Sequence, residues 1–329
     1  MRKLFIIFTA LLVFITNKKI VAQVDPHFTQ YYAFPLFLNP ALTGVIDGQY
    51  RVSGNFRNQW ASIATPISSK GFTADMPIGK GFGAGLMVMN QTAGDAGYFY
   101  NNVTASVSYQ IQLSENKILA AGFQAGFINR GINQSKLQFG NQFNPILGFD
   151  PTLPTNEVFN NTTTFALDVN AGLMYYDRSP SKTVNPFIGV SVYHPNKPKD
   201  KFLAATTSYV PMRFTMHGGF KLKLTDVVDL TPHAIYMQQG TAAEYAGGIN
   251  LNYSLDTYKD FILGATYRYK DAIAPNIGIH FNGLVIGLSY DVNVSSLNAA
   301  TSSRGGFELS MSFIGRNKIA EPKFICPRL

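Results

Sequence analysis

Apolar and polar residues alternate with a period of two from Tyr50 to about Gly315. In Phe99–Gln112 the odd positions are apolar apart from Asn101, and the even positions are polar. Phe165–Tyr175 and Tyr245–Leu255 alternate in the same way. This period is typical of β-strands that have one apolar face and one polar face. The sequence therefore predicts an all-β fold.

The alternating segments are long. They run over about 10 to 14 residues, whereas an ordinary strand has ~5–6 residues and a membrane-crossing strand ~9–11. Their polar face carries mostly Ser, Thr, Asn, Gln and Gly, and their apolar face often ends in Tyr or Phe, as an interfacial aromatic girdle does. We therefore predict an antiparallel transmembrane β-barrel of about 14 strands and favour it over a soluble β-rich secreted protein. The strands are expected to start near residues 50, 67, 81, 98, 117, 164, 185, 212, 227, 244, 259, 273, 284 and 305.

The connections between these strands alternate in length. Every second connection is short, and one of them, Asn282-Gly283, is a favoured two-residue hairpin turn. The long connections, Gly131–Thr163, Pro195–Tyr209 and Val294–Gly305, all have the opposite parity. Short periplasmic turns and long outer loops are typical of bacterial outer-membrane barrels with an even number of strands.

The first 49 residues differ from the rest. Met1–Gln23 has the charged start and short apolar stretch of a secretory signal, with cleavage expected after Ala22. The following segment is rich in aromatics, and its prolines exclude a regular helix or central strand. Because such apolar side chains are costly to leave in water, we expect it to pack in or under the barrel. The predicted division is a signal peptide (1–22), an N-terminal plug-like segment (23–49), the barrel (50–315) and a short periplasmic C-terminal tail (316–329).

Composition narrows the function. Only 14% of the 329 residues are charged, against about 25% in an average soluble domain, while 46% are hydrophobic, which excludes a disordered chain. The net charge of +8 is largely the signal: without its four Lys and Arg, 23 basic residues face 19 acidic ones. No basic cluster remains, so we expect no nucleic-acid partner. The single cysteine, Cys326, cannot form an intramolecular disulfide.

Candidate chemistry is sparse. Four glycines in GKGFGAGL superficially suggest a dinucleotide loop, but the strand alternation continues through them, so we place Gly79, Gly81, Gly83 and Gly85 on the inner face. The five histidines occur singly, and acidic residues such as Asp75, Asp168 and Glu308 look isolated. We therefore expect no catalytic residue, metal site or cofactor, and no enzyme activity. An outer-membrane lipid-modifying enzyme would need a Ser–His–carboxylate cluster at the rim.

A cation, two amides and the only tryptophan stand together in Arg57-Asn58-Gln59-Trp60, where the first strand should meet the outer rim. The residues alone favour a girdle Trp60 beside an Arg57 that extends its guanidinium to the membrane surface.

Asp25–Gly44 (DPHFTQYYAFPLFLNPALTG) resembles the N-terminal signature of the PorP/SprF family of type IX secretion system outer-membrane proteins. Tyr267–Ala272, Ser289–Asp291, Phe307–Leu309 and the ending Cys326–Arg328 agree with the family in order, with Phe307 and Leu329 as mild departures. The residues that carry the resemblance are Asp25, Pro26, Phe28, Gln30, Tyr31, Tyr32, Pro35, Asn39, Pro40, Arg57, Asn58, Gln59 and Trp60.

The resemblance implies a non-enzymatic barrel of protein secretion, cell-surface anchoring and gliding motility. Its implied partners are outer-membrane lipid, the type IX periplasmic components, and a secreted surface adhesin or its C-terminal domain. The long loop Gly131–Thr163 is the candidate cargo surface. For the cationic tail, with Lys323, Cys326, Pro327 and Arg328, periplasmic docking and simple flexibility stay open. The alternative function is an outer-membrane transport barrel for a small or hydrophobic solute.

Overall fold

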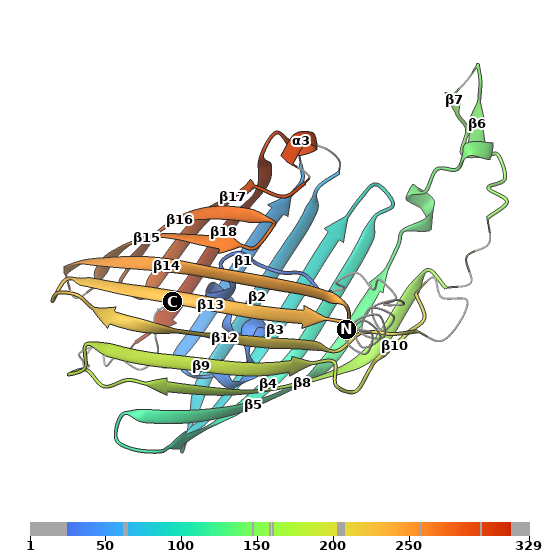
Figure 1. Cartoon of the computed structure of the whole chain (residues 1–329). Helices are drawn as coiled ribbons and strands as arrows, with labels where there is room; N and C mark the ends of the chain where they lie inside the picture. The colour runs from blue at the N-terminus through green and yellow to red at the C-terminus, as the bar shows by residue number, and fades with distance from the viewer. Residues whose placement is uncertain are drawn as a thin grey trace, which may run out of the picture.

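The computed structural model describes residues 25–61, 65–146, 148–157, 159, 161–202, 208–256, 258–296 and 298–316. Fourteen long antiparallel strands form a closed barrel, and pairing of the first strand with the last closes it (Figure 1). In chain order these strands are β1 (Tyr50–Gln59), β2 (Ile67–Gly79), β3 (Phe82–Ala93), β4 (Tyr98–Gln112), β5 (Lys117–Gly131), β8 (Thr163–Asp177), β9 (Val184–Tyr193), β12 (Arg213–Lys223), β13 (Val228–Gln239), β14 (Ala242–Asp256), β15 (Lys259–Arg268), β16 (Ala272–Phe281), β17 (Leu284–Asn293) and β18 (Arg304–Gly315).

The predicted barrel is confirmed. Each of the fourteen strands begins within two residues of the position expected from the alternation. Along β4, Val103 and Val107 are exposed on the outer face, whereas Thr104, Ser106 and Ser108 are buried on the inner face. The apolar residues thus coat the outside of the wall, and the polar residues line its inside.

The long loops all lie at one end of the barrel, and the connections at the other end are short. In the turn between β16 and β17, Asn282 and Gly283 both have positive φ (49° and 85°), as a two-residue hairpin turn requires. Gly79 and Gly81 also have positive φ (93° and 82°) and flank the β2–β3 turn. The expectation that both face the lumen was therefore wrong, because strand alternation ends at the turn. Gly83 does face inward, against Thr43.

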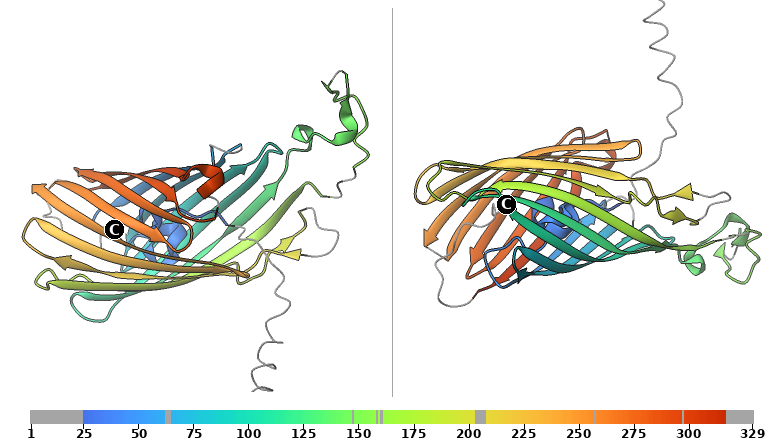
Figure 2. Two further views of the ribbon diagram at one scale, coloured as in Figure 1. Left: turned by 45° about the horizontal axis from the view of Figure 1, so that its top comes forward. Right: turned by 90° about the horizontal axis from the view of Figure 1, so that it is seen from below.

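The long loops carry short elements of their own. The loop after β5 contains a hairpin that projects well past the end of the barrel (Figures 1 and 2). The loop after β9 carries a second short strand pair, and the loop before β18 carries one helical turn. These elements are η3 (Gln134–Lys136), η4 (Gly140–Gln142), β6 (Phe143–Asn144), β7 (Gly148–Phe149), β10 (Lys199–Asp200), β11 (Ser208–Tyr209) and α3 (Asn298–Thr301).

The segment before β1 lies inside the barrel (Figure 2). It forms three short turns, η1 (Tyr31–Ala33), α2 (Pro35–Leu38) and η2 (Pro40–Leu42). Pro35 and Pro40 stand at the first positions of α2 and η2, where proline fits because its missing N–H would have no helical partner. We call residues 25–44 the plug. The predicted signal peptide and the tail residues Lys323, Cys326, Pro327 and Arg328 lie outside the described residues.

Candidate functional site

The plug is fixed to the barrel wall by polar contacts at several levels. Its residues hydrogen-bond to strands on all sides of the lumen: β1, β2, β4, β5, β8, β9, β12, β13, β15, β17 and β18. A segment held around so much of the circumference blocks the lumen. The candidate site is therefore the plug with its surrounding wall, together with the outer loops above it.

Glu308 on β18 holds the plug near the outer end of the barrel. Its carboxylate accepts hydrogen bonds from the backbone N–H groups of Thr29 (2.7 Å) and Gln30 (2.8 Å). The Arg57 guanidinium lies 3.5 Å from the same carboxylate and donates to the Thr29 hydroxyl at 2.7 Å. An acidic side chain of the last strand thus holds Thr29 and Gln30, and a basic side chain of the first strand also holds Thr29.

Asp291 extends this cluster to two further strands. Its carboxylate accepts from Arg57 and from Arg268, each at 2.7 Å, and from the Thr29 hydroxyl at 2.8 Å. Arg268 also donates to the Thr29 hydroxyl at 3.0 Å. Arg57 is only 1% exposed, so the interpretation that it extends to the membrane surface was wrong. Ion pairing in the lumen outweighs the reach of its long side chain toward water.

A second ionic cluster binds the first described residue. The Asp25 carboxylate lies 2.9 Å from His194 Nε2 and 3.0 Å from the Arg213 guanidinium. The other ring nitrogen of His194 lies 2.6 Å from Asp168 on β8. His194 directly follows β9 with positive φ (60°), which turns its ring back over the lumen.

Charge stabilises the ionised forms of this pair. Burial opposes the charge on His194, but the carboxylates of Asp25 and Asp168 outweigh it and raise the pKa of His194 to about 9. Burial likewise disfavours the Asp25 carboxylate, and the charges of His194 and Arg213 overcome it, so the pKa of Asp25 lies well below its ordinary value. Asp25 and His194 therefore form an ion pair at neutral pH.

A third ionic contact lies near the opposite end of the plug. Arg51 on β1 and Asp75 on β2 form a bidentate pair at 2.8 and 2.9 Å. Asp75 also accepts from the Gly44 N–H (2.7 Å), and Arg51 donates to the Leu42 carbonyl (3.0 Å). Asp75, Asp168 and Glu308 looked isolated in the sequence, and that interpretation was wrong because their partners come from other strands.

Between the ionic contacts the plug touches the wall closely. Asn39 donates to the Leu173 carbonyl at 2.9 Å. A Cβ added to Gly172 would lie 2.0 Å from the Asn39 side-chain oxygen, and one added to Gly122 would lie 2.2 Å from the backbone of Pro40. Glycine at these inward positions makes room for the plug.

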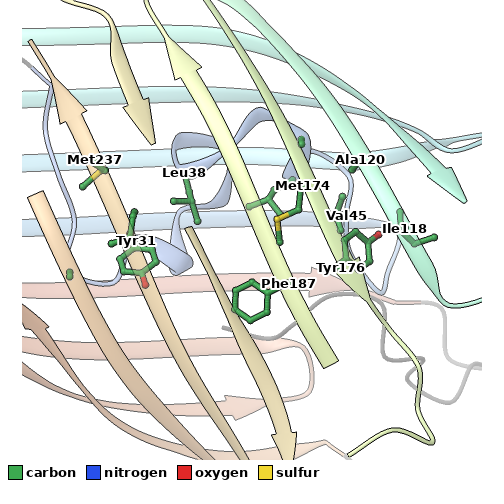
Figure 3. Packing of buried hydrophobic residues seen from close by; sticks show 13 residues of the cluster. Tyr31, Leu38, Val45, Ile118, Ala120, Met174, Tyr176, Phe187 and Met237 are labelled. Carbon is green, nitrogen blue, oxygen red and sulfur yellow. The ribbon is translucent and has the colours of Figure 1, made fainter. Parts of the chain in front are cut away.

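Apolar side chains of the plug pack against the inner wall in two clusters. In one, Tyr31 and Leu38 of the plug pack among Met174, Phe187 and Met237 of the wall (Figure 3). Full burial of each such side chain contributes about 1.5–3 kcal/mol. The other cluster joins plug residues Phe28, Phe34, Leu36 and Phe37 to wall residues Met87, Met89, Tyr100 and Ile128.

The outer loop after β5 is the largest surface beyond the barrel. Its hairpin tip carries exposed apolar side chains, with Ile146 91% exposed and Phe143 52% exposed. The Phe143 ring packs against Phe149 across the two short strands, with 5.6 Å between ring centroids. Exposed apolar residues at the tip of a long loop are typical of a protein-binding surface.

The structure brings most of the sequence-predicted site residues together. Asp25, Pro26, Phe28, Gln30, Tyr31, Tyr32, Pro35, Asn39, Pro40 and Arg57 all lie in the plug or against it. Asn58 and Trp60 lie on the outer side of β1 or at its end, and the partly buried Gln59 ends that strand.

Sequence reasoning missed the wall residues that hold the plug: Arg51, His194, Arg213, Arg268 and Asp291. The signal for two of them was present, since Arg268 and Asp291 lie in the stretches Tyr267–Ala272 and Ser289–Asp291 that resemble the family.

Within the described residues, no group of three or more His, Cys, Asp or Glu could hold a metal ion. Of the helices that the structure describes, none is both long enough and apolar enough to cross a membrane.

Fold and plug together define an outer-membrane-type β-barrel with an occupied lumen. Among solved structures the chain resembles the toluene transporter TbuX of Ralstonia pickettii, at 10% identity and a TM-score of 0.51, over 85% of this chain and 92% of that one. It also resembles the P. putida toluene transporter TodX, at 8% identity and a TM-score of 0.50, over 85% and 93% of the chains. These similarities show the fold alone. No curated protein sequence matches the chain.

A family model identifies the chain more closely. Residues 20–313 match the type IX secretion system membrane protein PorP/SprF, so the chain belongs to the PorP/SprF family. The fold and the family both point to the outer membrane, and the family links the chain to type IX secretion.

Proposed function

We propose that this chain is a non-enzymatic outer-membrane component of type IX secretion that binds a secreted surface protein with its outer loops. The observation that carries the proposal is the plug, which blocks the lumen through contacts on all sides. A barrel closed in this way has its rim and loops left for binding a protein. The loop after β5 offers the largest such surface, with an exposed apolar tip at Phe143 and Ile146.

A surface-proteome comparison tests this proposal. Deleting the gene should selectively remove a surface protein, and the wild-type gene should restore it. A Phe143→Ser/Ile146→Ser variant should fail to restore it. The matched control is Leu224→Ser/Val227→Ser, which changes two exposed apolar residues in the β12–β13 turn at the other end of the barrel. Unchanged surface and secreted proteomes after the deletion would refute the proposal.

The periplasmic end is proposed to contact the secretion machinery. Arg316 follows β18 and pairs there with Asp47, its guanidinium 3.5 Å from the carboxylate. We infer that the tail beyond it, with Lys323, Cys326 and Arg328, docks on a periplasmic component. Removing residues 317–329 should abolish co-purification of that component from native membranes, and its unchanged recovery would contradict docking.

Solute transport is the second candidate function, because solved barrels of similar fold are named toluene transporters. Between plug and wall there is a small cavity, lined by residues that include His27, Phe37 and Met237. It has room for about one water molecule. Because the plug is hydrogen-bonded to the wall on all sides, passage of a solute would require the plug to move. An electrically silent wild-type barrel in planar bilayers would argue against this candidate, and steady conductance would support it.

A further inference from the structure

Away from the ends of the described strands, the charged and amide side chains on the outer face of the barrel form one row. Lys70 on β2, Asn90 on β3, Asn101 on β4 and Asn129 on β5 are direct cross-strand neighbours. All four alternate with inward residues, so they point away from the lumen. On the described strands, other outward charged and amide side chains, such as Lys117, stand at or next to strand ends.

The row lies at the outer boundary of the lipid-facing coat. Two residues nearer the periplasm on the same four strands, every outward side chain is apolar and exposed: Phe72, Val88, Val103 and Phe127. A charge facing lipid costs about 2–4 kcal/mol at the bilayer midplane and about 0–1 near its surface. The row therefore belongs at the level of the lipid headgroups, where its polar groups find partners.

The row has hydrogen-bonding capacity that the protein leaves unused. Asn90 donates to Asn101 at 2.7 Å. The side-chain oxygens of Asn129 and of Asn58 on neighbouring β1 are shielded from water and have no hydrogen-bond partner among the described atoms. Lys70 makes no ion pair within the described part of the chain. Such groups require an external partner.

The charge of this surface is positive. A second lysine without an ion-pair partner among the described side chains, Lys136, lies over the β3–β4 turn, its Cδ 3.0 Å from where a Cβ on Gly97 would be. None of the described outward positions of β1–β5 carries an acid. Asp95, in the same turn, accepts a hydrogen bond from Thr65. On the periplasmic side of Asn129, which ends the row, the ring of Phe127 stacks on Phe165 with 5.0 Å between ring centroids.

We propose that this row binds the headgroup of a phosphorylated glycolipid of the outer leaflet, the class to which lipopolysaccharide belongs. Lys70 pairs with a phosphate, and the asparagine amides hydrogen-bond to sugar hydroxyls. A lysine and amides, without acids, match an anionic headgroup rich in hydroxyls. The bound lipid fixes the side of the barrel formed by β2–β5 in the membrane, below the loop after β5.

Native mass spectrometry of the purified full chain in lipid nanodiscs tests the proposal. The probes are diphosphoryl lipid A and its dephosphorylated form. The variant is Lys70→Leu/Asn90→Val/Asn101→Val/Asn129→Val, and the matched control is Lys117→Leu/Gln238→Val, two outward polar residues at strand ends elsewhere. Because the variant only places apolar groups on a lipid-facing surface, both proteins should fold, as heat-modifiable migration in electrophoresis would show.

We expect wild type and control to bind diphosphoryl lipid A alike. The variant should bind it at least about tenfold more weakly, because it loses the charge-assisted hydrogen bond of Lys70 and also the hydrogen bonds of the asparagine amides. Dephosphorylated lipid A should bind the wild type about tenfold more weakly, because it cannot form the charge-assisted hydrogen bond with Lys70. Equal binding of diphosphoryl lipid A by wild type and variant would overturn the proposal. The proposal would also be overturned if the variant, purified from native membranes, had lost a bound protein but no lipid.

Discussion

Arg57→Ala should destabilise the barrel more than an average substitution does. Arg57 is buried and bonds Asp291 and the Thr29 hydroxyl, each at 2.7 Å. Removing one partner of a buried ion pair costs about 3–5 kcal/mol, because a charge is left without compensation. Arg268 stays on Asp291, so the expected loss in free energy of unfolding lies near the lower end, about 3 kcal/mol.

Equilibrium urea unfolding in lipid vesicles measures this loss. Trp60, the only tryptophan, stands three residues from Arg57 and reports unfolding by its fluorescence. The matched control is Lys223→Ala, which removes an exposed ion pair with Asp226 and should change stability little, because water screens an exposed pair. If Arg57→Ala costs no more than this control does, the view that Arg57 fastens the plug is refuted.

Three further outcomes are expected. Gly122→Val places side-chain atoms where the plug backbone lies and should therefore displace the plug. The purified variant should then conduct ions in planar bilayers, whereas the wild type should be silent. A variant that folds and is silent would contradict closure of the lumen by the plug. The raised pKa of His194 stabilises the fold below pH 6.5 and loses this effect as the pH rises through about 9. Between pH 7 and 10 the free energy of unfolding of the wild type should therefore fall by up to about 3 kcal/mol more than that of His194→Gln does. Parallel unfolding profiles would refute a stabilising ion pair between His194 and Asp25. Tyr193→Phe removes a 2.7 Å hydrogen bond to the Phe37 carbonyl, but Arg213 still donates to that carbonyl. Urea unfolding should therefore show a loss of only about 1 kcal/mol in free energy of unfolding. A loss above about 3 kcal/mol would mean that the remaining bond does not compensate.

Local pattern was enough to predict the wall of the barrel. A strand such as β4 needs only alternation to place Val103 outside and Thr104 inside, and Asn282-Gly283 needs only its own backbone preferences to form a turn. Each of these features depends on neighbours in sequence. This is why the strand starts agree so closely with the expectation.

The contacts that hold the plug could not be predicted in this way. Arg57 and Asp291 are 234 positions apart and meet only because closure pairs β1 with β18, whose other neighbour is β17. Alternation shows that each points inward, but not which inward residue it meets. Arg57 was misinterpreted for this reason, since a lone arginine near a rim more often extends to water.

Photo-crosslinking at Ile146 in intact cells tests the central claim most directly, namely that a plugged barrel holds a secreted protein on its outer loop. A photoreactive residue at this exposed position should form a covalent adduct with a secreted protein whose surface display depends on the chain. The same residue at Val227, in a turn at the other end of the barrel, should not form this adduct. Loss of the surface protein from the deletion strain, with no adduct at Ile146, would contradict the claim.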